Sequence, residues 1–287
     1  MTRRQLLSSA PILGLSVPLL AQKTECRLRA GLVAYSMRKE LKSGELSYEK
    51  LIHMVADLGL TGLDTTVYWF PDTTDQYLAY LRRTAYRNGV SLYSVSARVH
   101  LCQPTRELQD AEVQKARNWL QVAEKLGAGH LRIFGGAAPK GASDEQCIGW
   151  ATEVVKRCAE IAEPKGICLG IEDDGGISTT AEQTIELMKR AQSPVVGINL
   201  DTGNFPRDGY KQVAMCLPYA LNVHFKEQIS NVAGEKEPAD WNRLAGMFAQ
   251  AGYRGYLSLE FEDPDKAAVE VPRYCGELRK LVQKYSG

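Results

Sequence analysis

The chain has 287 residues, 44% hydrophobic and 24% charged, and its formal net charge is +1 at pH 7. These values are those of an ordinary soluble globular protein. Basic and acidic residues are interspersed, so the sequence lacks the clustered basic residues that are typical of a nucleic-acid-binding protein. It also gives no support for binding to an anionic membrane surface.

The N-terminal residues 1–25 differ from the rest of the chain. Arg3 and Arg4 precede an apolar run that continues to Ala21, the pattern of a charged region followed by the hydrophobic region of an export signal. The stretch "TRRQLL" resembles a bacterial twin-arginine signal. The run is short for a spanning helix, so we expect no stable membrane span. We predict a signal peptide over 1–25 and export to the periplasm; a frayed helix or an uncleaved anchor is the alternative.

From Arg29 onward, short apolar segments alternate with segments of helical periodicity. The latter carry apolar residues three and four positions apart, and several end in a glycine suited to a left-handed C-cap (Gly59, Gly89, Gly127 and Gly166). Predicted strands cover 30–37, 62–70, 91–98, 130–136, 168–173, 195–201, 221–227 and 256–262. Predicted helices cover 46–59, 74–89, 110–127, 143–166, 179–191, 210–220, 240–252 and 267–285.

The predicted strands are short, rich in Val, Ile and Leu, and apolar on both faces, as expected of parallel strands covered by helices. Eight such units over about 260 residues have the size of a (β/α)₈ TIM barrel. A doubly wound open sheet would usually bring a glycine-rich loop after its first strand, and "VAYSMRKE" has none. We predict one α/β domain over 26–287. Its seven scattered cysteines are expected to be buried thiols rather than a disulfide framework.

The last four predicted strands each bring one potential metal ligand to the C-terminal end of the barrel, where such folds place their active sites. These residues are Glu172, Asp201, His224 and Glu260, at intervals of 29, 23 and 36 residues. Three converging carboxylates would repel one another, and a divalent cation resolves that conflict. The donor set suits Mn²⁺, Co²⁺, Zn²⁺, Mg²⁺ or Fe²⁺. Taken singly, each residue is equally consistent with a salt bridge, a turn or core packing.

Five stretches resemble the sugar phosphate isomerase/epimerase group, the xylose isomerase-like TIM barrels: "LGAGHLRIFGG", "LGIEDDGG", "VGINLDTGNF", "VHFKE" and "YLSLEFE". The resemblance implies that Glu172, Asp201, His224 and Glu260 are metal ligands. It also implies that Glu172 and Glu260 are the acid/base pair. In two places the chain departs from the family pattern: Asp174 stands where many relatives have His, and "HFKE" replaces His-x-Lys-Asp. The first departure prevents transfer of substrate identity.

Six further residues are candidates for substrate binding. Lys226 shares the inward face of its strand with His224, and Arg132 in "HLRIF" can meet a phosphate or carboxylate. A salt bridge from Lys226 to Glu227 or Glu262, and a buried ion pair for Arg132, are the structural alternatives. The other candidates are Asp174, Asn204, His100 and Trp69, the last by stacking on a sugar face.

These residues predict a metal-dependent sugar isomerase or epimerase. The cation would polarise a carbonyl, one glutamate would remove the neighbouring proton, and the other would return a proton to the metal-stabilised enediolate. Elimination from an oxidised glycoside by a lyase shares the first step, and a metal-bearing carbohydrate-binding protein remains a third possibility. The expected partner is a small carbohydrate or glycoside, with no nucleic acid, and a homo-oligomer is possible. The sequence names neither the sugar nor the metal.

Overall fold

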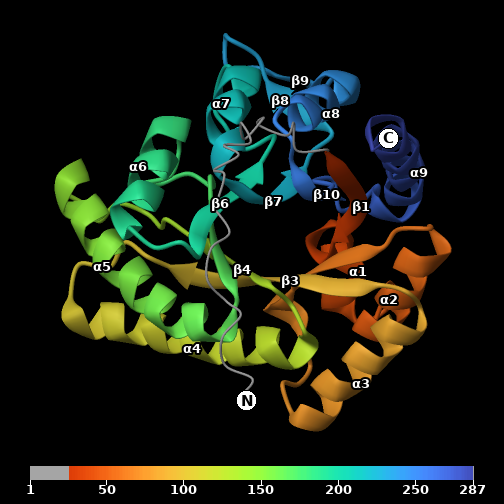
Figure 1. The fold of residues 1–287 in the computed structure, drawn as a ribbon, viewed down its shortest axis with the longest axis horizontal. Coiled ribbons are helices and arrows are strands. Elements are labelled where there is room, and N and C mark those ends of the chain that lie inside the picture. Colours follow the sequence, from red (N-terminus) through yellow and green to blue (C-terminus); the bar gives the residue numbers. More distant parts are fainter. Residues whose placement is uncertain (1–25, 287) are drawn as a thin grey trace, which may run out of the picture.

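The computed structural model describes residues 26–286 (Figure 1). The predicted signal peptide over 1–25 lies outside the described residues, so the export signal stays a prediction. Within the described range, no helix combines the length and the apolar character needed to cross a membrane.

Eight parallel strands close into one barrel, which confirms the predicted architecture. Their order around the barrel is β1-β10-β7-β6-β5-β4-β3-β2. The eighth barrel strand is numbered β10 because two short strands, β8 and β9, precede it. The barrel strands are β1 (Arg27–Val33), β2 (Gly62–Thr66), β3 (Ser91–His100), β4 (His130–Phe134), β5 (Cys168–Glu172), β6 (Val196–Asp201), β7 (Ala220–Phe225) and β10 (Arg254–Leu259).

Helices follow the barrel strands and lie around the outside of the barrel (Figure 1). Local sequence explains where several of them begin: Ser143 and Thr180 form capping boxes with Gln146 and Gln183 at the starts of α5 and α6. The four glycines predicted as C-caps all have positive φ. The outer helices are α2 (Tyr48–Asp57), α3 (Asp75–Arg87), α4 (Arg106–Leu126), α5 (Asp144–Ala162), α6 (Ala181–Ala191), α7 (Gly209–Cys216), α8 (Trp241–Gln250) and α9 (Ala267–Tyr285).

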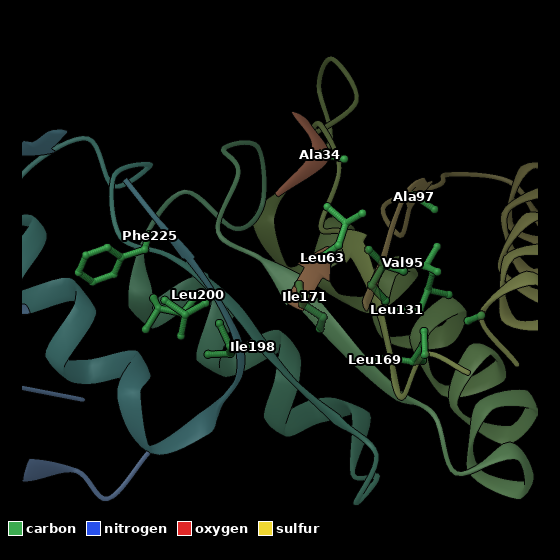
Figure 2. Close-up of a cluster of buried hydrophobic side chains, with 14 of the residues drawn as sticks. Ala34, Leu63, Val95, Ala97, Leu131, Leu169, Ile171, Ile198, Leu200 and Phe225 are labelled. Atoms are coloured by element: carbon green, nitrogen blue, oxygen red, sulfur yellow. The ribbon is translucent and has the colours of Figure 1, made fainter. Parts of the chain in front are cut away.

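The strands alternate between an outer apolar face and an inner polar face, so the expectation of two apolar faces is wrong. Figure 2 shows part of the outer layer, to which β5 contributes Leu169 and Ile171 and β6 contributes Ile198 and Leu200. The inner positions carry polar or small residues. Hydrogen bonds join strands that are not neighbours in the barrel, such as Asn222 of β7 to Asp64 of β2, and these bonds therefore cross the interior.

The interior leaves little free space near the start of β5. A Cβ atom on Gly170 would lie 2.2 Å from Nε2 of His130, whose imidazole crosses from the neighbouring strand β4. Nδ1 of His130 lies 2.8 Å from the Ser94 hydroxyl of β3. His130 therefore fills the barrel below the strand ends.

Two predicted strands end in 3₁₀ turns in the structure. β1 ends at Val33 and β2 at Thr66, and each continues into a 3₁₀ turn, at Ala34–Met37 and Val67–Trp69. The first turn is held by Ser36, which donates a hydrogen bond to the Leu259 carbonyl and accepts one from the backbone of Phe261. The second begins where the Tyr48 hydroxyl bonds the carbonyl of Thr66.

Three short elements were not predicted: helix α1 (Arg38–Ser43) and the antiparallel pair β8 (Gln228–Ser230) and β9 (Lys236–Pro238). This pair follows β7 and covers the loop after β6. The Ser230 hydroxyl donates to the carbonyl of Phe205, and Lys236 bonds the carbonyl of Gly203. All seven cysteines are free thiols; five are buried as expected, whereas Cys26 and Cys168 are partly exposed.

Candidate metal centre and pocket

The structure brings the four predicted ligands together. Glu172 and Asp201 are the last residues of β5 and β6, His224 lies in β7, and Glu260 directly follows β10. These four strands are consecutive around the barrel. All four side chains are buried, and each offers a ligand atom within 4.8 Å of the others. Residues separated by almost 90 positions in the sequence thus share one point at the C-terminal end of the barrel.

Two of the potential ligand atoms at this point lack hydrogen-bond partners among the described residues. Nδ1 of His224 lies 2.6 Å from Oε2 of Glu260 and 2.8 Å from Oε1 of Glu172, yet it makes no hydrogen bond with either. Oδ2 of Asp201 is also buried without a hydrogen bond. Buried polar atoms are normally satisfied. These two atoms, of which Oδ2 of Asp201 is contacted only by the Lys226 ammonium at 3.2 Å, converge with two carboxylates. The set therefore fits a shared cation, with the oxygen and nitrogen ligands that divalent metals accept.

The electrostatics of the cluster support this fit. Burial raises the pKa of Asp201 to about 7, helped by the charges of Glu260 and Glu172 and opposed by Lys226. Burial would also raise the pKa of Glu260, but Lys226 and His224 outweigh it and hold that pKa well below its ordinary value. Burial and the neighbouring carboxylates thus oppose ionisation of Asp201, and a divalent cation would favour its ionised form.

A buried carboxylate that the sequence analysis did not identify, Asp64 of β2, orients His224. Its Oδ2 lies 3.1 Å from Nε2 of His224 and accepts a hydrogen bond of 2.9 Å from Asn222, while its Oδ1 accepts one of 2.6 Å from Ser96. Burial opposes ionisation, yet hydrogen bonding and charge from His224 lower the pKa of Asp64 to about 2. Because Asp64 contacts Nε2 of His224, Nδ1 is the imidazole nitrogen that faces the cluster. Carboxylates commonly fix ligating histidines in this way.

Glu172 is fixed by an amide and by an arginine. Oε1 accepts a hydrogen bond of 2.9 Å from Asn199, which itself accepts one of 2.7 Å from Asn222. Oε2 lies 2.9 Å from Nη1 of Arg132, and both side chains are about 5% exposed. Arg132 also donates to the Tyr68 hydroxyl at 2.8 Å. The structural alternative for Arg132, a buried ion pair, is therefore present in the site itself.

Lys226 reaches the same cluster, as expected from its position two residues after His224. Nζ lies 3.2 Å from Oδ2 of Asp201 and 3.2 Å from Oε1 of Glu260, and it also pairs with Glu262. The side chain is about 6% exposed. Burial would lower the pKa of Lys226, but the surrounding carboxylates raise it well above its ordinary value. Lys226 thus places a fixed positive charge beside both Asp201 and Glu260.

A pocket of about 270 Å³ opens above the cluster, and both glutamates line it. Of the six predicted substrate-binding residues, five line this pocket: His100, Arg132, Asp174, Asn204 and Lys226. Burial, together with the charge of Glu172, raises the pKa of Asp174 to about 6. Trp69 is not among the lining residues; its ring stacks on Tyr35 at 6.0 Å, and Tyr35 faces the pocket in its place.

Sequence reasoning missed several residues of this pocket. Tyr68 and Tyr35 lie in 3₁₀ turns that the sequence analysis assigned to strands, and Glu262 lies in the loop after β10. Arg98 lies on β3, which continues to His100 instead of ending at Arg98 as predicted. The alternation along β3 was the available signal, because Arg98 follows the inward Ser94 and Ser96 at two-residue intervals.

A larger hollow of about 1010 Å³ lies at the opposite end of the barrel, against the C-terminal end of α3. It is lined by strand starts, such as Arg29 and Ser91, and contains none of the four clustered residues. The chemistry-bearing side chains therefore lie in the smaller pocket, at the end where TIM barrels carry their active sites.

A closed parallel barrel with a buried cluster of three carboxylates and a histidine at its C-terminal rim defines a TIM-barrel protein with a candidate metal site. The chain belongs to the Xylose isomerase-like TIM barrel family, whose sequence model matches residues 52–278. The chain matches no curated protein sequence.

Solved structures share the fold at low identity. One is a D-psicose 3-epimerase with D-tagatose from Clostridium cellulolyticum H10, with TM-score 0.69, 18% identity and coverage of 90% of this chain and 95% of that one. A xylose isomerase-like protein from Mycobacterium smegmatis in complex with magnesium has TM-score 0.69, 17% identity and coverage of 90% and 98%. The IOLI protein with a zinc atom has TM-score 0.71, 16% identity and coverage of 90% and 99%.

Proposed function

We propose that this protein is a divalent-metal-dependent isomerase or epimerase of a small carbohydrate. The observation that carries the proposal is the placement of Glu172 and Glu260. Their carboxylates lie 2.8 and 2.6 Å from the same nitrogen of His224, and both border one pocket. Two carboxylates beside one substrate space can act as base and acid. The epimerase among the similar structures supports the choice of a sugar.

Glu172, Asp201, His224 and Glu260 would hold the cation, whose identity among Mn²⁺, Co²⁺, Zn²⁺, Mg²⁺ and Fe²⁺ stays open. When bound, a divalent cation supplies Lewis-acid polarisation of a substrate carbonyl. The magnesium and zinc bound to two of the similar structures are compatible with such a site.

The residues of the chain would then move the proton. One glutamate removes the proton from the carbon next to the carbonyl, and the other delivers a proton to the opposite face or to the neighbouring carbon. Lys226 and His224 keep the Glu260 carboxylate ionised, so it is unprotonated before the reaction begins. The Lys226 ammonium, 3.2 Å from that carboxylate, lies where it can balance the charge of the enediolate. Tyr35 and Tyr68 form an aromatic wall against which a sugar ring can lie.

The test is proton exchange in D₂O. Purified protein is loaded with each candidate cation and incubated with a panel of ketoses and aldoses, and NMR follows deuterium at the carbon next to the carbonyl together with any new sugar. We expect Glu172→Gln and Glu260→Gln each to lower turnover by about 10²- to 10⁴-fold. Glu107→Gln on the exposed face of α4 is the control and should retain full turnover.

The metal content of each variant separates loss of the cation from loss of the acid or base. Full turnover by either pocket variant would refute the assignment. Release of an aglycone from a 3-keto glycoside, without a rearranged sugar, would instead identify the lyase, and binding without any exchange would identify a carbohydrate-binding protein.

A further inference from the structure

Arg98 is a cation of the pocket that lacks a counter-charge. It lies on β3, is exposed and lines the pocket. Its guanidinium lies 4.0 Å from the centre of the Tyr68 ring. Among the described residues, no carboxylate forms an ion pair with it. This contrasts with the other basic residues of the pocket, because Arg132 pairs with Glu172 and Lys226 pairs with three carboxylates.

The neighbours of Arg98 hold it in place without using its donors. The guanidinium carbon of Arg98 lies over the Tyr68 ring, and no hydrogen bond from the Arg98 N–H groups is found among the described residues. The Tyr68 hydroxyl is itself fixed by Arg132 at 2.8 Å, and the guanidinium of Arg132 lies 4.0 Å from the centre of the Phe134 ring. A planar donor group held in this way is suited to bind a carboxylate or phosphate in a bidentate manner.

The position of Arg98 relative to the four-residue candidate metal cluster determines where on a bound ligand an anionic group would lie. Glu172 contacts Arg132, Arg132 contacts Tyr68, and Tyr68 contacts Arg98. Two side chains, Tyr68 and Arg132, thus link Arg98 to Glu172, and Arg98 stands on β3, outside the four strands that carry the cluster. The acidic residues Asp174 and Glu262 also line the pocket, but Glu262 pairs with Lys226 and Arg38.

We propose that the substrate is a monosaccharide-sized sugar with an anionic group, a carboxylate or a phosphate, at the end remote from its carbonyl, and that Arg98 binds this group. The inference rests on the proposed function, since it specifies the substrate of the same site. A pocket of about 270 Å³ holds one small molecule rather than an oligosaccharide. The unpaired guanidinium selects the charged member of any pair of otherwise identical sugars.

The experiment compares binding of three matched ketoses to the metal-loaded protein by calorimetry. D-fructose, D-fructuronate and D-fructose 6-phosphate differ only at carbon 6, which bears a hydroxyl, a carboxylate or a phosphate. We expect the wild-type protein to bind at least one anion about 10-fold or more tightly than D-fructose, the effect of one charge-assisted contact. The more tightly bound anion identifies which of the two groups the site takes.

Substitution at Arg98 tests whether this preference arises there. Arg98→Gln should reduce the ratio of affinities to near one, and Arg98→Lys should restore part of it. Arg87→Gln, at another exposed arginine at the end of α3 remote from the pocket, is the matched control and should leave the ratio unchanged. Circular dichroism and metal content confirm that each variant is folded and loaded.

Equal affinities for the three ketoses, no binding of either anion, or a preference that survives Arg98→Gln would overturn the proposal. Deuterium exchange distinguishes failure of the anion-site proposal from failure of the proposed isomerase function. Exchange on neutral sugars without an Arg98-dependent preference leaves the isomerase and removes the anionic substrate. An Arg98-dependent preference without exchange on any ligand keeps the anion site and removes the isomerase.

Discussion

Asp64 and His224 form a pair in the barrel interior, with Oδ2 of one 3.1 Å from Nε2 of the other and both side chains fully buried. They come from β2 and β7, strands that lie on different sides of the barrel. The pair fixes which imidazole nitrogen faces the three carboxylates. The geometry of the candidate metal centre thus depends on a residue that contributes no ligand atom to it.

We therefore expect Asp64→Asn to weaken metal binding by about 10- to 100-fold while all four ligands remain in place, because an amide no longer stabilises the required form of the imidazole. Competition against a chromogenic chelator measures the affinity. Asp57→Asn, on the exposed face of α2, is the control. Unchanged affinity in Asp64→Asn would show that the ring needs no such partner.

Removal of the cation should lower thermal stability. A ligand present at about 100 times its Kd contributes about 2.7 kcal/mol to folding, which corresponds to a Tm increase of about 5 to 10 °C for a chain of this size. Differential scanning calorimetry of chelator-treated and reloaded protein measures the difference. Asp201→Asn, which replaces a buried carboxylate, should abolish the increase. A reloaded wild-type protein that melts like the chelated one would count against a metal site.

The stability of the fold should depend on pH through His130. Burial lowers the pKa of His130 to about 4 from an ordinary 6.5. The unfolded chain therefore takes up a proton at higher pH than the folded one. The neutral imidazole of His130 therefore contributes roughly 3 kcal/mol to the free energy of unfolding above pH 6.5. This contribution is lost as the pH falls toward 4.

Urea unfolding at several pH values tests this prediction. His130→Asn retains a polar group near Ser94 but cannot be protonated, so its stability should fall less than that of the wild type between pH 6.5 and 4. His53→Gln, at an exposed position of α2, should follow the wild type. Parallel pH curves for His130→Asn and the wild type would show that His130 is not responsible.

The outer apolar layer should account for much of the stability. Phe225 of β7 is fully buried, with its ring 5.1 Å from that of Trp241 and 6.4 Å from that of Phe248 on α8. Phe225→Ala should lower the free energy of unfolding by about 3 to 5 kcal/mol, because it removes buried area and leaves a cavity. Chemical denaturation measures the change. Tyr86→Ala, at an 86% exposed ring, should cost less than about 0.5 kcal/mol.

The barrel and its four-residue cluster could be predicted because both follow from periodicity. Glu172, Asp201, His224 and Glu260 occupy equivalent positions in consecutive units, and a closed barrel of parallel strands brings such positions together. Asp64 could not be found in this way, since it stands within "GLDTT" rather than at a strand end. Its role depends on a contact across the barrel, and no pattern along the chain encodes that contact.

Strand ends were predicted less well than strand existence. The residues after Val33 and Thr66 are apolar or aromatic and extend the strand pattern, but side-chain hydrogen bonds from Ser36 and Tyr48 turn the chain there. Tyr35 and Tyr68 consequently face the pocket, whereas Trp69 packs behind Tyr35. Arg98 was missed for the opposite reason, since β3 continues for two residues beyond its predicted end.

The order of the strands around the barrel divides the pocket into two arcs. β5, β6, β7 and β10 carry the groups assigned to proton transfer, and the arc from β1 to β4 carries Tyr35, Tyr68, Arg98 and Arg132. Replacement of Tyr35 or Arg98 can therefore change which molecule is accepted while the reactive machinery stays intact, whereas Arg132 is needed to hold Glu172. Such separation gives a single scaffold a direct route to new substrates during divergence.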